Sequence, residues 1–591
     1  MKQSLTSVLA LAAGAFASII PHHDSVQLIH EPTLKPRQAC ENTPTSRECW
    51  GEYSLDTNYY EDIPDTGRTV EYWLTAQEGP CSPDGYLRTC MTFNGTIPGP
   101  TIIADWGDNV KIHVSNNMAS NGTAVHWHGV RQLDSLLADG VPGVTQCPIA
   151  PGESMTYEFR ATQYGSSWYH SHFSLQYAEG LFGGMIFNGP ANGNYDEDLG
   201  TLLLQDWSHI ETFNRWNVAK QGKAPTLESS LINGTNTFNC AGSTDPKCIG
   251  GGKKFEMVFE PGKKYRLRLV NVAVDGVFQF SIDGHELTVI ANDFVPIQSY
   301  TTDSIQITIG QRYDVIVEAK PSDSALDAYW LRGGWVNRCT PHGNIADITG
   351  IVRYNTSSTA PPTTLSTITP STHCLDEPLS KTIPRLALDV QNIPPAGLIL
   401  ENLNFTSGQV FQWTINSSSL VLDWKNPTMM HIFNDESLFP TPFNVVPIGH
   451  SSAPSSTPEW AVLIIQDVGT IKLAHPIHLH GHDFWVVAQV PSAKWDGTTS
   501  SFQTTNPPRR DVATLPGGGY LALAFLLDNP GAWLVHCHIA WHASQGLSLE
   551  FVEDQKDIKV RVPPHEEQQF RDTCSSWAGH TPAWPQDDSG I

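Results

Sequence analysis

Ten of the 23 histidines fall into four short motifs that have the spacing of metal ligands. The motifs are His126-Trp-His128, His170-Ser-His172, His475-Pro-Ile-His478-Leu-His480 and His536-Cys-His538-Ile-Ala-Trp-His542. Successive side chains of a β-strand point to opposite faces, so each His-X-His pair presents two imidazoles on one face. The four motifs therefore predict eight imidazoles that can converge on a metal cluster.

Cys537 lies between two of these histidines and must point to the opposite face of its strand. His542 follows it by five residues, and His475 precedes the His-X-His pair of the third motif. Two imidazoles and one thiolate in a trigonal arrangement are typical of blue copper, whose fourth, axial ligand is weak. An isolated His-X-His pair would fit a zinc site or core histidines better. Four pairs together with a His-Cys-His favour two kinds of copper site, back to back.

The 11 cysteines are an odd number, so one is unpaired if the others form disulfides. Local spacing and the remainder favour the pairs Cys40–Cys49, Cys81–Cys90, Cys240–Cys248, Cys339–Cys374 and Cys147–Cys574. Spacing does not prove connectivity, but this set leaves Cys537 free to bind a metal. Disulfides form in the secretory route, so cysteine usage indicates export.

The N-terminus predicts a secretory signal peptide over residues 1–17. Lys2 supplies the positive end, an apolar stretch follows, and Ala15-Phe-Ala17 is a small-residue cleavage site. Residues 18–37 are polar and end at Arg37, which suggests a pro-segment. No later stretch approaches the run of about 18 apolar residues that spans a bilayer. We expect a secreted glycoprotein with sequons at Asn94, Asn121, Asn233, Asn355, Asn404 and Asn416.

Composition limits the partners of the chain. The formal net charge of −25 argues against nucleic acid, because a phosphate-binding surface needs clustered lysine and arginine. We expect small-molecule substrates and no membrane partner. A monomer is expected, although a dimer is compatible with the sequence.

Length and patterning predict an all-β fold of three consecutive β-sandwich domains. Alternating apolar and polar residues indicate strands, for example at 109–114, 265–272, 304–309 and 313–319. A Thr/Ser/Pro-rich stretch at 355–372 looks like a linker, and two motifs of the first third are echoed in the last. The expected boundaries are 38–195, 196–360 and 361–560, followed by a C-terminal tail at 561–591.

The four motifs resemble those of the multicopper oxidases, above all those of ascomycete laccases, and the likeness runs from about Cys40 to the last residue. It implies cupredoxin-like Greek-key domains and four copper ions per chain, with phenolic substrates oxidised and dioxygen reduced to water. Carried onto this sequence, the type 1 copper ligands are His475, Cys537 and His542. The type 2 ligands are His126 and His478. The type 3 ligands are His128, His170, His172, His480, His536 and His538.

The resemblance also assigns residues around these ligands. Leu547 occupies the axial type 1 position and cannot coordinate, which should raise the reduction potential, although simple core packing explains a leucine equally well. Glu228 would accept the phenol proton beside His542 and Trp541; a surface-loop glutamate is the alternative. Asp139 would help to deliver protons to oxygen, unless it only forms a turn before Gly140. A second acid found in some relatives is replaced here by Ala540.

The last four residues, Asp588-Ser589-Gly590-Ile591, resemble a laccase terminus that fills the solvent channel to the copper cluster. A loose polar tail is the competing interpretation. Three other functions share much of this pattern: a phenol-coupling oxidase of pigment or secondary-metabolite synthesis, a ferroxidase, and a copper-storage protein without turnover. A ferroxidase needs acidic residues around the type 1 histidine, and the sequence does not display them recognisably.

Overall fold

The computed structural model describes residues 27–28, 40–320, 326–345, 347–391, 393–436, 438–450, 459–580 and 586–591. The expected signal peptide lies outside these residues. So does the possible pro-segment, apart from the short strand β1 (Gln27–Leu28), which pairs with β4.

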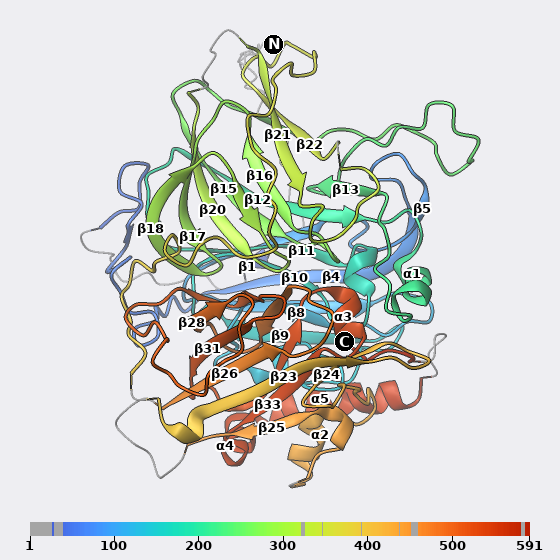
Figure 1. Ribbon diagram of the computed structural model, residues 1–591, viewed down its shortest axis with the longest axis vertical. Coiled ribbons are helices and arrows are strands. Elements are labelled where there is room, and N and C mark those ends of the chain that lie inside the picture. Colours follow the sequence, from blue (N-terminus) through green and yellow to red (C-terminus); the bar gives the residue numbers. More distant parts are fainter. Residues whose placement is uncertain are drawn as a thin grey trace, which may run out of the picture.

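Strands dominate the structure and form three successive units, each built from two sheets (Figure 1). In the first unit, one sheet has the order β5-β4-β7-β9, with β1 also paired to β4, and the other has the order β6-β11-β10-β8. The bounds are β4 Thr69–Cys81, β5 Arg88–Phe93, β6 Gly99–Asp105, β7 Asn109–Asn116, β8 Val125–Trp127, β9 Ser154–Arg160, β10 Gly165–Ser171 and β11 Phe182–Asn188. The small hairpin β2 (Cys49–Trp50) and β3 (Tyr53–Ser54) precedes them.

The second unit has the orders β13-β12-β15-β20-β17-β18 and β14-β22-β21-β16-β19. Its strands are β12 Glu197–Trp207, β13 Ser229–Ile232, β14 Glu256–Val258, β15 Lys264–Asn271, β16 Phe278–Ile282, β17 Leu287–Asn292, β18 Val295–Thr302, β19 Ile305–Ile307, β20 Arg312–Glu318, β21 Ala328–Trp335 and β22 Thr349–Arg353. The strands expected at 109–114, 265–272 and 313–319 are therefore present as β7, β15 and β20, and the one at 304–309 is shortened to β19.

The third unit has the orders β24-β23-β26-β31-β28-β29 and β25-β33-β32-β27-β30. Its strands are β23 Leu398–Thr406, β24 Gln412–Ile415, β25 Val445–Ile448, β26 Trp460–Asp467, β27 His475–Leu479, β28 Phe484–Val490, β29 Arg509–Arg510, β30 Val512–Leu515, β31 Tyr520–Leu526, β32 Gly531–Cys537 and β33 Ser548–Glu553. Every strand of the second unit thus has a counterpart eleven strands later in the same sheet position. The first unit follows the same plan without counterparts of β17, β18 and β19.

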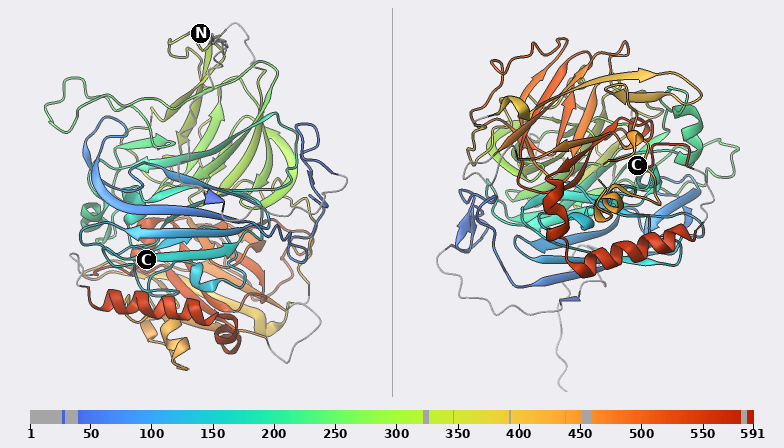
Figure 2. Two further views of the ribbon diagram at one scale, coloured as in Figure 1. Left: turned by 180° about the vertical axis from the view of Figure 1, so that it is seen from behind. Right: turned by 90° about the horizontal axis from the view of Figure 1, so that it is seen from below.

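Helices are few and short. They are α1 Thr212–Ala219, α2 Thr428–Phe433, α3 Ala540–Ser544, α4 Gln555–Arg561 and α5 Pro564–Ala578, with 3-10 turns at Leu136–Ala138, Gln176–Glu179, Pro395–Gly397 and Thr441–Phe443. None of the described helices is both long and apolar enough to cross a membrane. α5 makes part of the expected tail at 561–591 helical. It lies along the first unit (Figure 2) and is linked to it by the disulfide Cys147–Cys574.

The strand patterns explain where the core lies. In β7, Val110, Ile112 and Val114 are buried while the residues between them are more accessible, so one face of this strand packs inward. In contrast, β32 is buried along its whole length because both of its faces are covered by protein. A strand buried on both faces can present different side chains to two separate interior sites.

The structure forms five disulfides, Cys40–Cys49, Cys81–Cys90, Cys147–Cys574, Cys240–Cys248 and Cys339–Cys374. All 11 cysteines lie in the described part of the chain, and Cys537 is the free one, fully buried on β32. It is therefore available to a metal.

Candidate metal centres

Two histidine motifs lie side by side in the first unit and two in the third. β8 and β10 pair with His126 opposite His170, and β27 and β32 pair with His478 opposite His536. β8, β10, β27 and β32 end at residues 127, 171, 479 and 537, so the second histidine of every His-X-His pair begins the following loop. Sheet pairing therefore aligns the motifs within each unit.

The two pairs of motifs face each other between the first and third units. Nε2 of His126 lies 3.4 Å from Nε2 of His478, and Nε2 of His538 lies 3.3 Å from Nδ1 of His128. All eight imidazoles are at most 5% exposed. The structure thus brings together the eight imidazoles that the spacing places on common faces, although the two halves are more than 300 residues apart in sequence.

The hydrogen bonds of these rings fix which nitrogen carries the proton. Main-chain oxygens accept from Nδ1 of His126, His170, His478 and His536 at 2.8, 3.1, 2.7 and 3.0 Å. Because a carbonyl oxygen can only accept, the neutral form of each ring carries its proton on Nδ1 and a lone pair on Nε2. In the described residues Nε2 of His170 and of His536 has no hydrogen-bond partner, and Nε2 of His126 faces that of His478. Converging buried lone pairs without donors are the donor set of a metal cluster.

The eight rings divide into groups that could each hold an ion. His172, His480 and His536 offer ligand atoms within 4.8 Å of one another. His126, His128 and His170 form a second such group, and the ring of His538 lies 5.0 Å from that of His128. A third group joins His126 to His478 and His480. The groups share members, so neighbouring ions would lie close together.

A separate site lies on the opposite face of β32. Sγ of Cys537 is 3.7 Å from Nδ1 of His475 and 3.6 Å from Nδ1 of His542, and the two nitrogens are 3.1 Å apart. The ring of Trp413 packs against both imidazoles, with centroids 4.8 and 5.0 Å away. The three donors fit the His2Cys set of a blue copper site.

Leu547 is buried beside this site and has no donor atom to offer. Its main chain accepts a hydrogen bond from the amide of Cys537 and donates one to the carbonyl of His542. The leucine therefore belongs to the turn that holds two members of the donor set, and its role as the axial residue stays a prediction.

Asp139 contacts two rings of the larger cluster. Its main-chain oxygen accepts from Nδ1 of His126, and its Oδ2 lies 2.9 Å from Nδ1 of His480. The carboxyl is buried. Asp139 thus orients imidazoles, and this contact with the cluster is what proton delivery would need.

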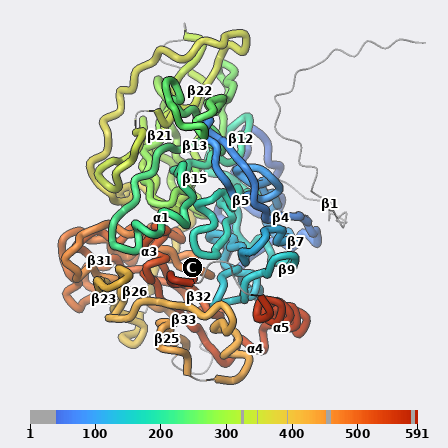
Figure 3. The backbone as a smooth tube through the Cα atoms, turned by 90° about the vertical axis from the view of Figure 1, so that its right-hand side faces the viewer, coloured from blue at the N-terminus to red at the C-terminus, as the bar shows by residue number. Residues whose placement is uncertain are grey.

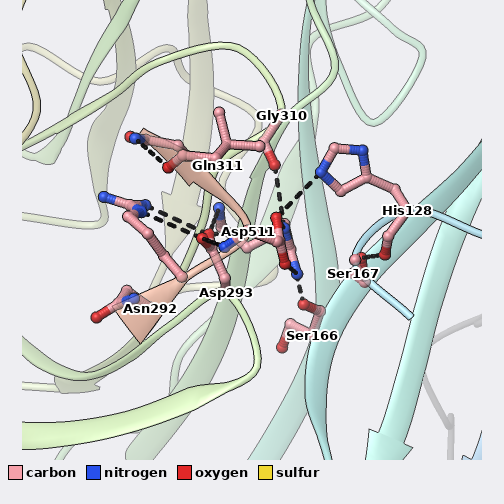
Figure 4. A network of polar contacts seen from close by, with 12 residues as sticks. His128, Ser166, Ser167, Asn292, Asp293, Gly310, Gln311 and Asp511 are labelled. Atoms are coloured by element: carbon pink, nitrogen blue, oxygen red, sulfur yellow. Dashed lines mark hydrogen bonds and ion pairs between the residues drawn. The ribbon is translucent and has the colours of Figure 1, made fainter. Parts of the chain in front are cut away.

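Asp511 is a functional candidate that the sequence did not single out. Its main-chain oxygen holds His478, and its Oδ1 lies 3.3 Å from Nε2 of His128, without the alignment of a hydrogen bond (Figure 4). Arg312 donates to both carboxylate oxygens of Asp511, and Asp293 accepts from the Asp511 amide. Arg312 and Asp293 of the second unit thereby contact a residue at the interface between the first and third units. The spacing of residues in the sequence does not predict these contacts of Asp511, because its partners come from distant strands.

A cavity of about 690 Å³ opens beside His542. Its wall comes from the second and third units and includes Trp413, Trp541 and the carboxyl-bearing Asp275. His542 is the partly accessible member of the smaller metal site. The cavity therefore gives an aromatic molecule access to one ligand of that site.

Asp275, a second residue missed in the sequence, is the one acidic residue among the described residues that line this cavity. Burial, and then the nearby Asp206 carboxyl, raises the pKa of Asp275 to about 8. Burial raises the pKa of Asp206 to about 6, against hydrogen bonds from the amides of Val274 and Asp275. In acidic solution Asp275 is therefore mainly protonated.

Glu228 does not line the cavity. Its carboxylate pairs with Arg215 and accepts from the amide of His209 at 3.0 Å. Its neighbour Leu227 forms a backbone bridge with His342, next to the cavity-lining Pro341. Glu228 therefore lies near the cavity edge with its carboxylate turned to Arg215.

The C-terminal residues are buried at the larger cluster. Ile591 is 3% exposed and lines a small space together with His170, His172, His536 and His538. In Figure 3 the chain end lies at the centre of the molecule, beside β32. The terminus thus sits against four imidazoles.

Hydrogen bonds hold this terminus in place. Ser589 donates its amide to Ser544 and accepts from the amide of Leu422, both at 2.9 Å. The Gly590 carbonyl accepts from the indole of Trp424 at 2.8 Å, and Asp588 accepts from the hydroxyl of Ser174. The backbone and side-chain contacts order the whole four-residue segment.

Comparison with known proteins decides the family. Multicopper oxidase family models match residues 75–192, 198–357 and 421–557. Laccase-2 and Laccase-1 of Botryotinia fuckeliana are 55% and 50% identical, over at least 99% of each chain. The chain belongs to the multicopper oxidase family. It is accordingly a copper-dependent oxidoreductase, and the predicted all-β fold of three cupredoxin-like domains is confirmed.

Solved multicopper oxidases share this architecture. The crystal structure of a laccase from Botrytis aclada is 55% identical, with a TM-score of 0.89 over 94% of this chain and 100% of that chain. A multicopper oxidase that functions in iron import is 26% identical, with a TM-score of 0.74 over 88% of this chain and 98% of that one. The identity and superposition are both higher for the laccase.

Proposed function

We propose that this multicopper oxidase is a secreted laccase, which oxidises phenols by one electron at a time and reduces dioxygen to water. The observation that carries the proposal is that neighbouring residues at the end of β32 face two different candidate metal sites. Cys537 faces one metal site, while His536 and His538 on either side of it face the other. A few backbone bonds therefore join an electron-accepting site to an oxygen-reducing one.

The donor sets support a content of four copper ions per chain. His475, Cys537 and His542 would hold the type 1 ion, with Leu547 as the axial residue. His126 and His478, whose Nε2 atoms face each other, would hold the type 2 ion. The remaining six imidazoles would hold the type 3 pair: His128, His170, His172, His480, His536 and His538. Copper bound there would supply one-electron transfer, storing the four electrons that dioxygen needs.

The protein's own groups would manage substrate and protons. His542 and Trp541 line the cavity, where an aromatic ring can pack close to the type 1 site. Asp139 would hold a proton beside His480, and Asp588 to Ile591 would close the channel to the cluster. Burial raises the pKa of Asp588 to about 6, so this carboxyl can carry a proton in mildly acidic solution. Water access and proton supply would thus be controlled at the same place.

A phenol loses a proton when it loses an electron, so a nearby carboxylate lowers the barrier. Glu228 is the proposed acceptor because it lies near the cavity edge, whereas burial raises the pKa of Asp275 to about 8, so in acidic solution this carboxyl would donate a hydrogen bond. Glu228→Gln should lower kcat/KM for 2,6-dimethoxyphenol at least about tenfold, since general base catalysis typically contributes more than that. Oxidation of a non-phenolic one-electron donor should be unchanged, because it releases no proton.

Asp275→Asn is the matched control, because it removes the other nearby carboxyl. A phenol-specific loss in this variant, with none in Glu228→Gln, would assign the proton acceptor to Asp275. Equal losses for phenol and non-phenolic donor in Glu228→Gln would reject a base at that position.

The laccase activity itself is tested with the copper-loaded protein. Metal analysis should give about four copper ions per chain, and the visible and EPR spectra should contain type 1 and type 2 signals. Oxygen uptake should amount to one dioxygen for about four phenols oxidised, without peroxide. Stable copper binding without oxygen uptake would leave a storage protein instead.

Two other oxidase functions compete with this proposal. A relative named dihydrogeodin oxidase, from Aspergillus terreus, is 40% identical over 93% of this chain, which keeps a dedicated phenol-coupling role as the second candidate. Ferrous iron is disfavoured because the described cavity wall contains lysine and arginine and a single, buried acid. Turnover measured with simple phenols and with the phenolic precursors of a coupling reaction separates a laccase from a dedicated phenol-coupling oxidase.

A further inference from the structure

The charge around the substrate cavity is opposite to that of the whole chain. Acidic residues outnumber lysine and arginine by 60 to 35 in the sequence. The cavity wall reverses this ratio, with Lys223, Arg338 and Lys472 against Asp275 alone. Asp275 is buried, whereas the three cationic residues are exposed to solvent. The cavity therefore carries net positive charge on an acidic protein.

Two of these cations are available to a ligand. Lys472 is partly neutralised, because its Nζ lies 3.6 Å from Oδ1 of Asp467 and donates to that residue's carbonyl. In the described parts of the chain, no ion pair joins Lys223 or Arg338 to a carboxylate. An anion that reached Lys223 or Arg338 would therefore break no existing ion pair.

The three cations come from separate parts of the fold. Lys223 follows α1, Arg338 follows β21 in the second unit, and Lys472 precedes β27 in the third. The disulfide Cys339–Cys374 lies in the same wall, directly after Arg338. Charge is thus gathered at the cavity from distant positions, and Arg338 is carried on a cross-linked segment.

The remainder of the wall suits an aromatic ring. Phe411, Trp413 and Trp541 line the cavity, and Trp413 also packs against the two imidazoles of the smaller metal site. A ligand that satisfies both parts has a phenol ring near His542 and an anionic group directed to the cations.

We propose that the cavity selects phenols that bear a carboxylate, through Lys223 and Arg338 with a smaller contribution from Lys472. The proposal rests on the proposed laccase function and specifies its substrate class. The attraction is between exposed charges, so it should favour binding and encounter over the chemical step and weaken with salt.

Three phenols with the same ring test this selection. They are 3-(4-hydroxy-3,5-dimethoxyphenyl)propanoate, its uncharged methyl ester and the corresponding phenylethylammonium, in which two saturated carbons insulate the ring from the charge. At a pH of about 6 the acid and the amine are both ionised. In the copper-loaded enzyme at low ionic strength, kcat/KM should fall from anion to ester to cation. The difference should lie in KM and shrink at about 0.5 M salt.

Substitution of the cationic residues by glutamine tests which of them contribute to the selection of anionic phenols. Arg338→Gln and Lys223→Gln should each lower the anion-to-cation ratio of kcat/KM about two- to fivefold, the range expected for an exposed ion pair. The double variant should lower it further, with little change for the ester. Lys556→Gln, on the exposed face of α4 and away from the cavity wall, is the matched control and should leave the ratio unchanged.

A ligand that cannot be oxidised at a phenol separates binding from turnover. 3-(3,4,5-Trimethoxyphenyl)propanoate should inhibit competitively, more strongly than its methyl ester, and the double variant should remove this preference. Equal kcat/KM for all three phenols, or a ratio unaffected by the double variant, overturns the proposed selection while leaving the laccase function intact. No oxidation of any of the three phenols would instead refute the laccase function.

Discussion

Cys537→Ser should give a colourless protein with no measurable oxidation of phenols, the largest loss of activity that we expect from one substitution. The thiolate is the donor that gives a blue copper site its strong absorption, and a serine hydroxyl does not replace it. Its two neighbours, His536 and His538, should still bind their share of the larger cluster. Visible absorption, EPR and oxygen uptake on the copper-loaded variant measure the outcome.

The expected spectrum distinguishes a lost site from a misfolded protein. The type 2 EPR signal should remain in Cys537→Ser while the type 1 signal disappears. A matched control removes sulfur elsewhere: Cys240→Ser with Cys248→Ser deletes a half-buried disulfide that closes an exposed loop, and it should keep both signals. Retained blue absorption in Cys537→Ser would contradict the assignment of this residue.

Arg312→Leu should lower the free energy of unfolding by about 3–5 kcal/mol, the usual cost of leaving one partner of a buried ion pair uncompensated. Arg312 and Asp511 are at most 2% exposed, and the guanidinium donates to both carboxylate oxygens. Burial raises the pKa of Asp511 to about 7, although Arg312 acts in the opposite direction. The full effect is therefore expected at about pH 8, where Asp511 is ionised.

Urea unfolding of the metal-free protein, with refolding checked, measures this cost. Arg353→Leu is the comparison: it removes an equally bidentate pair with Glu256, but that carboxylate is 45% exposed and should cost about 1 kcal/mol or less. Because Asp511 holds His478 and lies against His128, Arg312→Leu should also lower copper retention during dialysis against a chelator. A loss no larger than that of Arg353→Leu would refute the proposed contribution of the Arg312–Asp511 ion pair to stability.

The sequence predicted which imidazoles lie together, because the geometry within each motif is local. A His-X-His pair on a strand places both imidazoles on the same face. Cys537 was identified as the free cysteine because the other ten could be paired. That β8 and β27 would face each other is a long-range fact, which the spacing did not contain and which only the resemblance to the multicopper oxidases implied. The predicted grouping of side chains agrees with the structure where it depends on residues one or two positions apart.

The missed residues owe their position to packing between units. Arg312, Asp511 and Asp275 carry no motif, and each acquires its role from a partner more than 60 residues away. The second unit was predicted from its strand pattern alone, without a motif that marks the repeat. Its strands β16 and β21 correspond to β27 and β32 but pair Phe278 with Trp335, so no histidine marks the repeat.

The position of the eight imidazoles has a consequence for how the enzyme matures. Half of them are synthesised early in the chain and half near its end, so no complete cluster exists until the first and last domains have docked. Metal uptake at this site must therefore be a late event of biogenesis, and its binding free energy adds to the cohesion between those domains. A partly folded chain would not bind copper at this site, because its eight imidazoles are not yet assembled.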